Sequence, residues 1–143
     1  MIFKSLLIEN FQSHKKTKIN FDTGVNVFLG LSDTGKSAIF RALYWLMYNR
    51  PLGDSFRSWG EDLTKVTLLT DKDIIIRAKS AKTNYYQLND IIFKAFGQDP
   101  PDEITDALMI DRKINIQAQT DPIFMLSESP GSVASYFNDI ADL

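Results

Sequence analysis

The sequence has no cysteine and only one histidine, His14. The chain can therefore form neither a disulfide nor a thiolate metal site, and it cannot supply a two-histidine metal or catalytic arrangement. It also lacks a basic surplus, because 16 lysines and arginines stand against 18 aspartates and glutamates. A nucleic-acid-binding module usually carries excess positive charge. Any contact with DNA must be local or be supplied by a partner.

Long apolar runs are missing as well. None approaches the about 20 residues that a membrane helix needs. The N-terminal stretch MIFKSLLIENF has an early glutamate and no small-residue cleavage site, so it does not resemble a signal peptide. We therefore expect a cytoplasmic protein that has no membrane partner. The 143 residues, 44% of them hydrophobic, suffice for one domain with a substantial core.

The chain does contain a phosphate-loop motif, because residues 30–37 read GLSDTGKS and match G-x-x-x-x-G-K-S without a gap. The glycines let backbone N–H groups approach phosphate oxygens, and the N-terminus of the following helix favours an anion. Lys36 can reach the β- and γ-phosphates, and the Ser37 hydroxyl can bind Mg²⁺. The residues expected to contact a nucleotide here are Gly30, Ser32, Asp33, Thr34, Gly35, Lys36, Ser37 and Ala38.

The hydrophobic pattern around this loop predicts a mixed α/β fold. The expected strands are 2–10, 17–21, 25–30, 65–70, 73–80 and 84–88, where 25–30 is short and buried and 65–80 forms a hairpin. The expected helices are 36–48, 89–97, a short one within 98–109, and a last one with Ser129 as N-cap and Pro130 at its first position. Residues 110–126 are expected to mix strand and loop.

Hydrolysis of a nucleotide needs a further carboxylate that organises the metal, and it needs a group that orients water. Such an acid usually ends an apolar strand. Two candidates exist: Asp111 at the end of ALMID, and Asp71 at the end of TLLTD. Neither is convincing, because the stretch before Asp111 has a helical pattern and Asp71 fits a hairpin turn. The sequence thus predicts a nucleotide pocket but contains no convincing acid for hydrolysis.

Three stretches in order, LLIENFQSH, INFDTGVNVFLGLSDTGKSAIFRALYWLMYNRP and INIQAQTDPIFMLSESPGSVASYFNDIADL, resemble the N-terminal half of the head of SMC-like ATPases. The likeness is greatest to the SbcC-type ATPases of double-strand-break repair. It implies an antiparallel β-subdomain joined to the phosphate-loop strand and helix, as in the N-terminal lobe of an ABC-type head. In that family a long coiled coil separates this half from a C-terminal half that carries the Walker B acid and the signature motif. A chain ending at Leu143 within a helix resembles the first half alone, with the coiled coil starting from about residue 130.

The resemblance also assigns roles to residues outside the phosphate loop. Gln117 resembles the Q-loop glutamine, which binds Mg²⁺ and the attacking water, because Gln117 and Asp121 keep the spacing of Q-G-x-x-D. Gln119 is the rival for that role. The segment that contains Arg57, Ser58 and Trp59 resembles the one that lies along the adenine. Trp59 either stacks on the base or is a half-buried anchor.

Two positions depart from the family pattern. The residue after Asn10-Phe11 is often arginine or lysine in relatives, where it helps to hold the phosphates, but here it is the neutral Gln12. His14 or Lys15 is expected to substitute for that charge. Asp33 also places an acid in the loop, facing either solvent or an opposing head.

The resemblance implies a cycle in which two heads trap two ATP molecules with Mg²⁺, control an SbcD-type nuclease and grip DNA. Two basic groups could contact DNA phosphates or could simply be solvated: Lys15, Lys16 and Lys18, and Arg77, Lys79 and Lys82. A half-head alone is expected to dissolve poorly or to dimerise, since it leaves an apolar face open. Two alternatives remain: a self-contained small P-loop NTPase that uses Asp111 or Asp71, and a nucleotide-binding regulatory module without hydrolysis.

Overall fold

The computed structural model describes residues 1–110, 115–117 and 128–141. The chain divides into two compact units, Met1–Met109 and Ile110–Leu143. In the part of the chain that the structure describes, no helix is both long enough and apolar enough to cross a bilayer.

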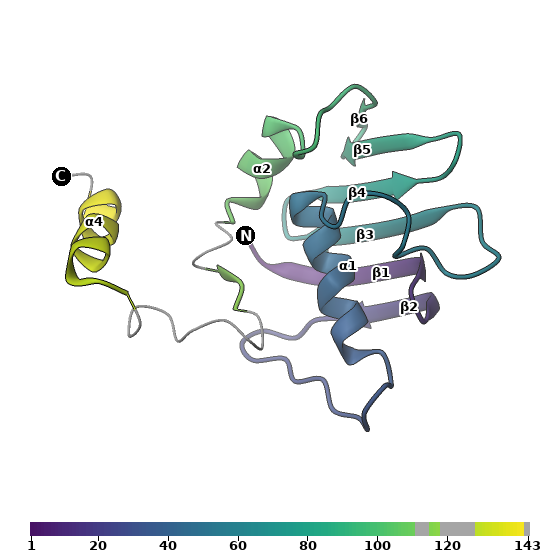
Figure 1. Cartoon of the computed structure of the whole chain (residues 1–143), viewed down its shortest axis with the longest axis horizontal. Coiled ribbons are helices and arrows are strands. Elements are labelled where there is room, and N and C mark those ends of the chain that lie inside the picture. Colours follow the sequence, from purple (N-terminus) through teal and green to yellow (C-terminus); the bar gives the residue numbers. More distant parts are fainter. Residues whose placement is uncertain (111–114, 118–127, 142–143) are drawn as a thin grey trace. The chain divides into compact units, whose positions relative to one another are not determined.

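The first unit is built on one antiparallel sheet with the strand order β2-β1-β3-β4-β5-β6 (Figure 1). The strands are β1 (Phe3–Phe11), β2 (His14–Asn20), β3 (Thr64–Thr70), β4 (Ile74–Lys79), β5 (Asn84–Leu88) and β6 (Ile91–Phe93). Alternating burial along β1 and β3 turns Leu6, Ile8, Val66 and Leu68 to the core, as period-2 patterning requires. The predicted strands at 2–10, 17–21, 65–70, 73–80 and 84–88 are confirmed, apart from shifts at their ends.

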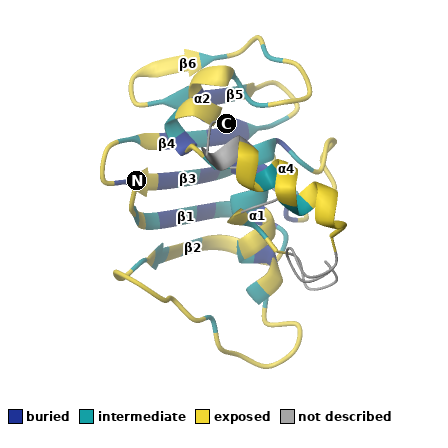
Figure 2. Ribbon diagram, turned by 90° about the vertical axis from the view of Figure 1, so that its left-hand side faces the viewer, coloured by how far each residue is buried: buried dark blue, intermediate teal, exposed yellow. Residues whose placement is uncertain are grey.

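Helix α1 (Lys36–Tyr48), which was predicted over the same residues, packs against β1, β3 and β4 (Figure 1). Its buried side chains are Ala38, Ala42, Trp45, Leu46 and Met47. The two alanines let the helix backbone lie close to the sheet. The rings of Phe11, Trp45 and Phe56 fill the space between the helix and the sheet, with ring centroids 4.5 to 5.9 Å apart. Figure 2 shows the buried residues concentrated where the sheet meets the helix.

Residues 25–30, predicted as a buried strand, form no strand in the structure. Val25, Val27 and Leu29 are 90%, 70% and 89% exposed. A strand exists only where a neighbour satisfies its backbone, and among the described residues no strand pairs with this stretch. Asn26 instead bonds to the turn before it, through the Asp22 N–H and the carbonyls of Asp22 and Gly24. The prediction was correct about the apolar character and wrong about burial and pairing.

Residues 89–97, predicted as a helix, are also different. Asn89 takes a left-handed φ of 52° at a tight turn, and β6 then pairs with β5 through Tyr86 and Phe93. The β-branched pair Ile91 and Ile92 suits an edge strand. A short apolar run does not distinguish strand from helix, and here the pairing with β5 decides.

The two other helices match their predictions. Helix α2 (Asp102–Leu108) lies in the first unit and buries Ile104 and Leu108. Helix α4 (Pro130–Ala141) lies in the second unit. The Ser129 hydroxyl accepts a bond from the Ser132 N–H at 3.2 Å, which confirms Ser129 as the N-cap.

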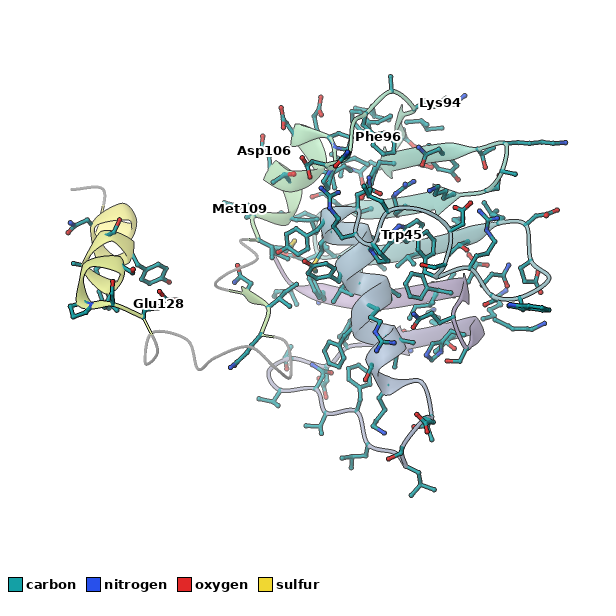
Figure 3. All side chains as sticks on the ribbon, viewed as in Figure 1. Trp45, Lys94, Phe96, Asp106, Met109 and Glu128 are labelled. Atoms are coloured by element: carbon teal, nitrogen blue, oxygen red, sulfur yellow. The ribbon has the colours of Figure 1, made fainter. Side chains whose placement is uncertain are left out.

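Arg77 is buried, although the sequence suggested a basic group that includes it. Its side chain is 1% exposed. The guanidinium lies 4.8 Å from the ring centroid of Trp45 and 5.1 Å from that of Phe96, both labelled in Figure 3. Burial lowers the pKa of Arg77, yet a guanidinium stays charged at neutral pH. Arg77 therefore stabilises the core and is not available to bind DNA.

Candidate functional site

The site begins where the phosphate loop turns into α1. Gly35 is the N-cap of α1 with a left-handed φ of 89°, and within the described part of the chain no side chain caps this end. The first turn also contains no acidic residue. The N–H groups and the positive dipole end of the helix are therefore available to an anion.

The ammonium group of Lys36 lies over the loop. It donates to the carbonyl oxygens of Gly30, at 2.7 Å, and of Leu31. The Thr34 hydroxyl also donates to Leu31, at 2.8 Å. These bonds hold the lysine charge above the loop backbone, which is the place where a phosphate-loop lysine meets phosphate oxygens.

Position 35 requires glycine for two reasons: its left-handed φ, and the side chains that a Cβ atom there would meet. A Cβ atom there would lie 2.7 Å from the Ser13 hydroxyl and 2.9 Å from Nε2 of His14. The imidazole of His14 is fixed on both sides, because Nδ1 lies 2.8 Å from the Thr17 hydroxyl and Nε2 lies 3.0 Å from the Gly35 carbonyl. The β1–β2 hairpin therefore packs against the phosphate loop at Gly35.

These parts line a cavity of about 270 Å³ that is open to solvent. Its lining comes from the tip of the β1–β2 hairpin, the phosphate loop and the first turns of α1. The lining residues are Gln12, Ser13, Asp33, Thr34, Gly35, Lys36, Ser37, Ala38 and Arg41. Seven residues predicted from the sequence are thus brought together. Gly30 and Ser32 lie in the same loop, and Gly30 acts through its carbonyl, but neither lines the cavity.

The segment expected along the adenine connects to the cavity through Gln12. The Ser58 hydroxyl donates to the Gln12 carbonyl at 2.7 Å, and the Gln12 N–H donates to the Phe56 carbonyl at 2.6 Å. Arg57 forms an ion pair with Asp54 at 3.2 Å. Trp59 is 99% exposed, so it is not a half-buried anchor of this fold.

Asp71 does not belong to this site. Its carboxylate accepts the Ile2 N–H at 2.7 Å, which lowers the pKa of the carboxyl group. It lies beside the start of β1, whereas Gln12 lies beyond the end of that nine-residue strand. At about 3.3 Å per residue the two are roughly 30 Å apart. Asp71 therefore cannot act as the metal-organising acid at this cavity.

The remaining predicted residues lie in the second unit or outside the described residues. Gln117 is exposed and belongs to the unit Ile110–Leu143. Asp111, Gln119 and Asp121 lie outside the described residues, so their predicted roles stay predictions.

Sequence reasoning missed two lining residues, Ser13 and Arg41. Arg41 could have been found, because it follows Ser37 by one helical turn on a helix whose bounds were predicted correctly. Ser13 is at the tip of the hairpin beside Gln12, and only the folding of β2 onto β1 brings it to the loop.

No group of three or more acidic or histidine side chains that could hold a metal occurs among residues 1–110, 115–117 and 128–141. Mg²⁺ is commonly bound by one or two protein ligands together with substrate phosphates and water. Ser37, which lines the cavity beside Lys36, fits that mode of binding.

Comparison with known proteins places this chain in a family. A family profile described as an AAA domain matches residues 5–128. The chain is 42% identical over 57 residues to the DNA double-strand break repair Rad50 ATPase of Methanococcus maripaludis, covering 40% of this chain and 6% of that protein. It is 29% identical over 154 residues to the Rad50 ATPase of Sulfurisphaera tokodaii, covering all of this chain and 17% of that protein. The chain thus spans a small part of the length of these relatives.

A solved SMC ATPase structure, described in terms of ATP-driven dimerization and DNA-stimulated activation, has the same fold. The TM-score is 0.71 at 22% identity, and the match covers 98% of this chain and 99% of that one. The profile match over most of the chain shows that this protein belongs to the AAA domain family. More particularly, its sequence is similar to those of Rad50 ATPases. The expected α/β head lobe with an antiparallel subdomain is confirmed.

Proposed function

We propose that this chain binds ATP with Mg²⁺ in the cavity between the phosphate loop, the tip of the β1–β2 hairpin and the start of α1, as the N-terminal half of the head of an SbcC-type ATPase. The observation that carries the proposal is the convergence of the loop, the uncapped start of α1 and Lys36 on one cavity. Backbone N–H groups and Lys36 bind the phosphates, and Ser37 binds the metal. The metal neutralises part of the phosphate charge when it is bound.

The adenine lies on the segment Arg57–Trp59 in this proposal. Ser58 joins that segment to the cavity wall through the Gln12 carbonyl, and Trp59 presents an exposed indole on which a base can stack. The chain has two tryptophans, and the other, Trp45, is buried. ATP should quench tryptophan fluorescence in the wild type and not in Trp59→Phe. Equal quenching in both would remove Trp59 from the site.

The catalytic centre is composite, and this chain alone hydrolyses ATP weakly or not at all. Val25, Val27, Leu29 and Leu31 are 70% to 90% exposed beside the phosphate loop, which supports a partner polypeptide that pairs with this stretch. That partner is the C-terminal half of the same head, and it brings the acid and the signature serine. Gln117 is the Q-loop residue that binds the metal and the attacking water.

The assembled head works as one of a pair. Two heads trap ATP between them, and the ATP cycle controls DNA binding and an SbcD-type nuclease in the cytoplasm. In this proposal residues 1–143 form the N-terminal half of the head, with the Walker A motif at 30–37 and the Q-loop near 117–121. Helix α4, which begins at Pro130, is the start of the coiled coil. The relation to Rad50-type ATPases supports this assignment.

The test is ATP binding and hydrolysis by the purified chain, alone and mixed with a candidate C-terminal head half. We expect binding alone and turnover only in the mixture, with binding lost in Lys36→Ala and turnover lost in Gln117→Ala. Gln119→Ala is the matched control, because it removes the rival glutamine of the same loop. Loss of turnover in Gln119→Ala alone would transfer the Q-loop role to that residue.

The two other candidate functions give different results in the same experiment. Turnover by the chain alone would support a self-contained small NTPase, for which Asp111 is the acid still available. Binding without turnover, even in the mixture, would support a regulatory nucleotide-binding module. Absence of nucleotide binding in the wild type would overturn all three.

A further inference from the structure

We propose that Arg41 is a second phosphate-binding cation of the cavity and that Gln12 holds it there. This inference rests on the proposed function, because it concerns how the same cavity binds a nucleoside triphosphate. The sequence led us to expect His14 or Lys15 to replace the charge absent at Gln12. The structure points to a residue of α1 instead.

Arg41 is placed to face the phosphate loop. It follows Ser37 by four residues on α1, so the two side chains occupy the same face of the helix. Long side chains on a helix lean toward its N-terminus, which here is the end that carries Lys36 and the loop. Arg41 accordingly lines the same cavity as Lys36 and Ser37.

Gln12 fixes the guanidinium without neutralising it. Nη1 of Arg41 donates to Oε1 of Gln12 at 3.2 Å. Gln12 is itself held by its backbone, through the bond to the Phe56 carbonyl and the bond from the Ser58 hydroxyl. A guanidinium has five N–H donors, and an amide carries no charge. The bond to Gln12 therefore orients Arg41 and leaves its charge available to a phosphate.

The two residues that the sequence suggested, His14 and Lys15, have other partners. Both ring nitrogens of His14 are in hydrogen bonds, to Thr17 and to Gly35. Lys15 forms an ion pair with Glu61 at 3.3 Å. Neither residue lines the cavity, where the charged side chains are Lys36, Arg41 and Asp33.

This arrangement favours ligands with several phosphates. Lys36 and the N-terminus of α1 already suffice for one phosphate group. A second cation one turn further along the helix adds charge-assisted hydrogen bonds for a longer phosphate chain. We therefore expect Arg41 to contribute to the binding of ATP and ADP much more than to the binding of AMP.

The experiment measures the affinity of the purified chain for ATP, ADP and AMP at two salt concentrations. Arg41→Gln should weaken ATP binding roughly tenfold, should reduce its salt dependence and should weaken AMP binding much less. The double variant Gln12→Arg with Arg41→Gln moves the cation to the other end of the same hydrogen bond. It should restore ATP binding to within about threefold of the wild type. Lys82→Gln, in the exposed turn between β4 and β5, is the control for loss of one positive charge.

The outcomes separate this inference from the proposed function. If Lys36→Ala abolishes ATP binding while Arg41→Gln behaves like Lys82→Gln, then Arg41 has no role and the proposed function stands. If Arg41→Gln weakens binding but the double variant does not restore it, the effect is structural and the inference fails. If the wild type binds no nucleotide, both proposals fail.

Discussion

Nε2 of His14 lies 3.0 Å from the carbonyl oxygen of Gly35, so the first residue of β2 is bonded to the N-cap residue of α1. Twenty-one positions of sequence separate the two residues. This bond links the sheet to the phosphate loop.

Replacement of His14 should loosen the phosphate loop more than it destabilises the fold. We expect His14→Ala to weaken nucleotide binding several-fold and to lower the free energy of unfolding by about 1 kcal/mol, the value of a lost hydrogen bond. Nucleotide titration and chemical denaturation measure the two effects. Thr17→Val is the control, because it removes only the partner of Nδ1. If both variants bind nucleotide like the wild type, the link is not needed for the loop.

Gly35 and Gly53 form a matched pair for testing close approach at the loop. Both have a φ of 89°, but only at Gly35 would a Cβ meet other atoms within 4 Å, at Ser13 and His14. Each alanine variant should lose about 1 kcal/mol through backbone strain. Only Gly35→Ala should also lose nucleotide binding, because the loop must move away from the hairpin. Equal nucleotide affinities in the two variants would contradict this reading of the contact.

Arg77 should be among the most costly residues to replace. Its guanidinium donates to Oδ1 of Asn49 and to the carbonyls of Ala78 and Tyr85, all at 2.7 to 3.2 Å. Arg77→Met removes these bonds from the core, including both that Oδ1 of Asn49 accepts from the guanidinium, so we expect a loss of about 3 kcal/mol in the free energy of unfolding. Lys79→Met, two residues along the same strand, should cost about 1 kcal/mol or less, because its ion pair with Asp54 is partly exposed. Similar losses in the two variants would mean that the buried network contributes little.

Tyr86 should make the fold sensitive to alkaline pH. Burial raises the pKa of Tyr86 above its ordinary value, and its hydroxyl donates to the Trp45 carbonyl at 3.3 Å. A group whose pKa is higher in the folded state stabilises the fold below its unfolded pKa of about 10 and loses that contribution as pH rises further. Urea denaturation from pH 8 to 11 should show a steeper loss above about pH 10 for the wild type than for Tyr86→Phe. Tyr85→Phe, at the neighbouring position on β5, should follow the wild type. Identical pH profiles for the wild type and Tyr86→Phe would contradict the prediction.

The exposed apolar stretch beside the loop should matter for association and not for the stability of this chain. Because Val27 is 70% exposed, Val27→Asp should change the free energy of unfolding by less than about 0.5 kcal/mol. It should weaken binding to a C-terminal head half, measured by co-purification or titration. Ile91→Asp, at another exposed apolar residue, on the edge strand β6, is the control for added negative charge. Unchanged association in Val27→Asp would argue against pairing along this stretch.

The sequence alone determined the parts of this protein that follow from local patterns. The strands β1, β3 and β4 and the bounds of α1 were predictable, because β-rich apolar runs favour strands and helical spacing of apolar residues favours a helix. The phosphate loop was predictable because Gly30, Gly35, Lys36 and Ser37 have roles that their spacing defines. The Ser129 cap was predictable for the same local reason.

Only the tertiary structure decided the rest. Residues 25–30 and 89–97 have apolar patterns that fit more than one element, and the presence or absence of a pairing strand settled each case. The cavity brings Gln12 and Ser13 to Lys36 through the fold of the β1–β2 hairpin against α1. Its second cation, Arg41, is held by a hydrogen bond to Gln12, which lies 29 positions away in the sequence. Such long-range bonds form only when the sheet and helix pack together, and no local pattern in the sequence encodes them.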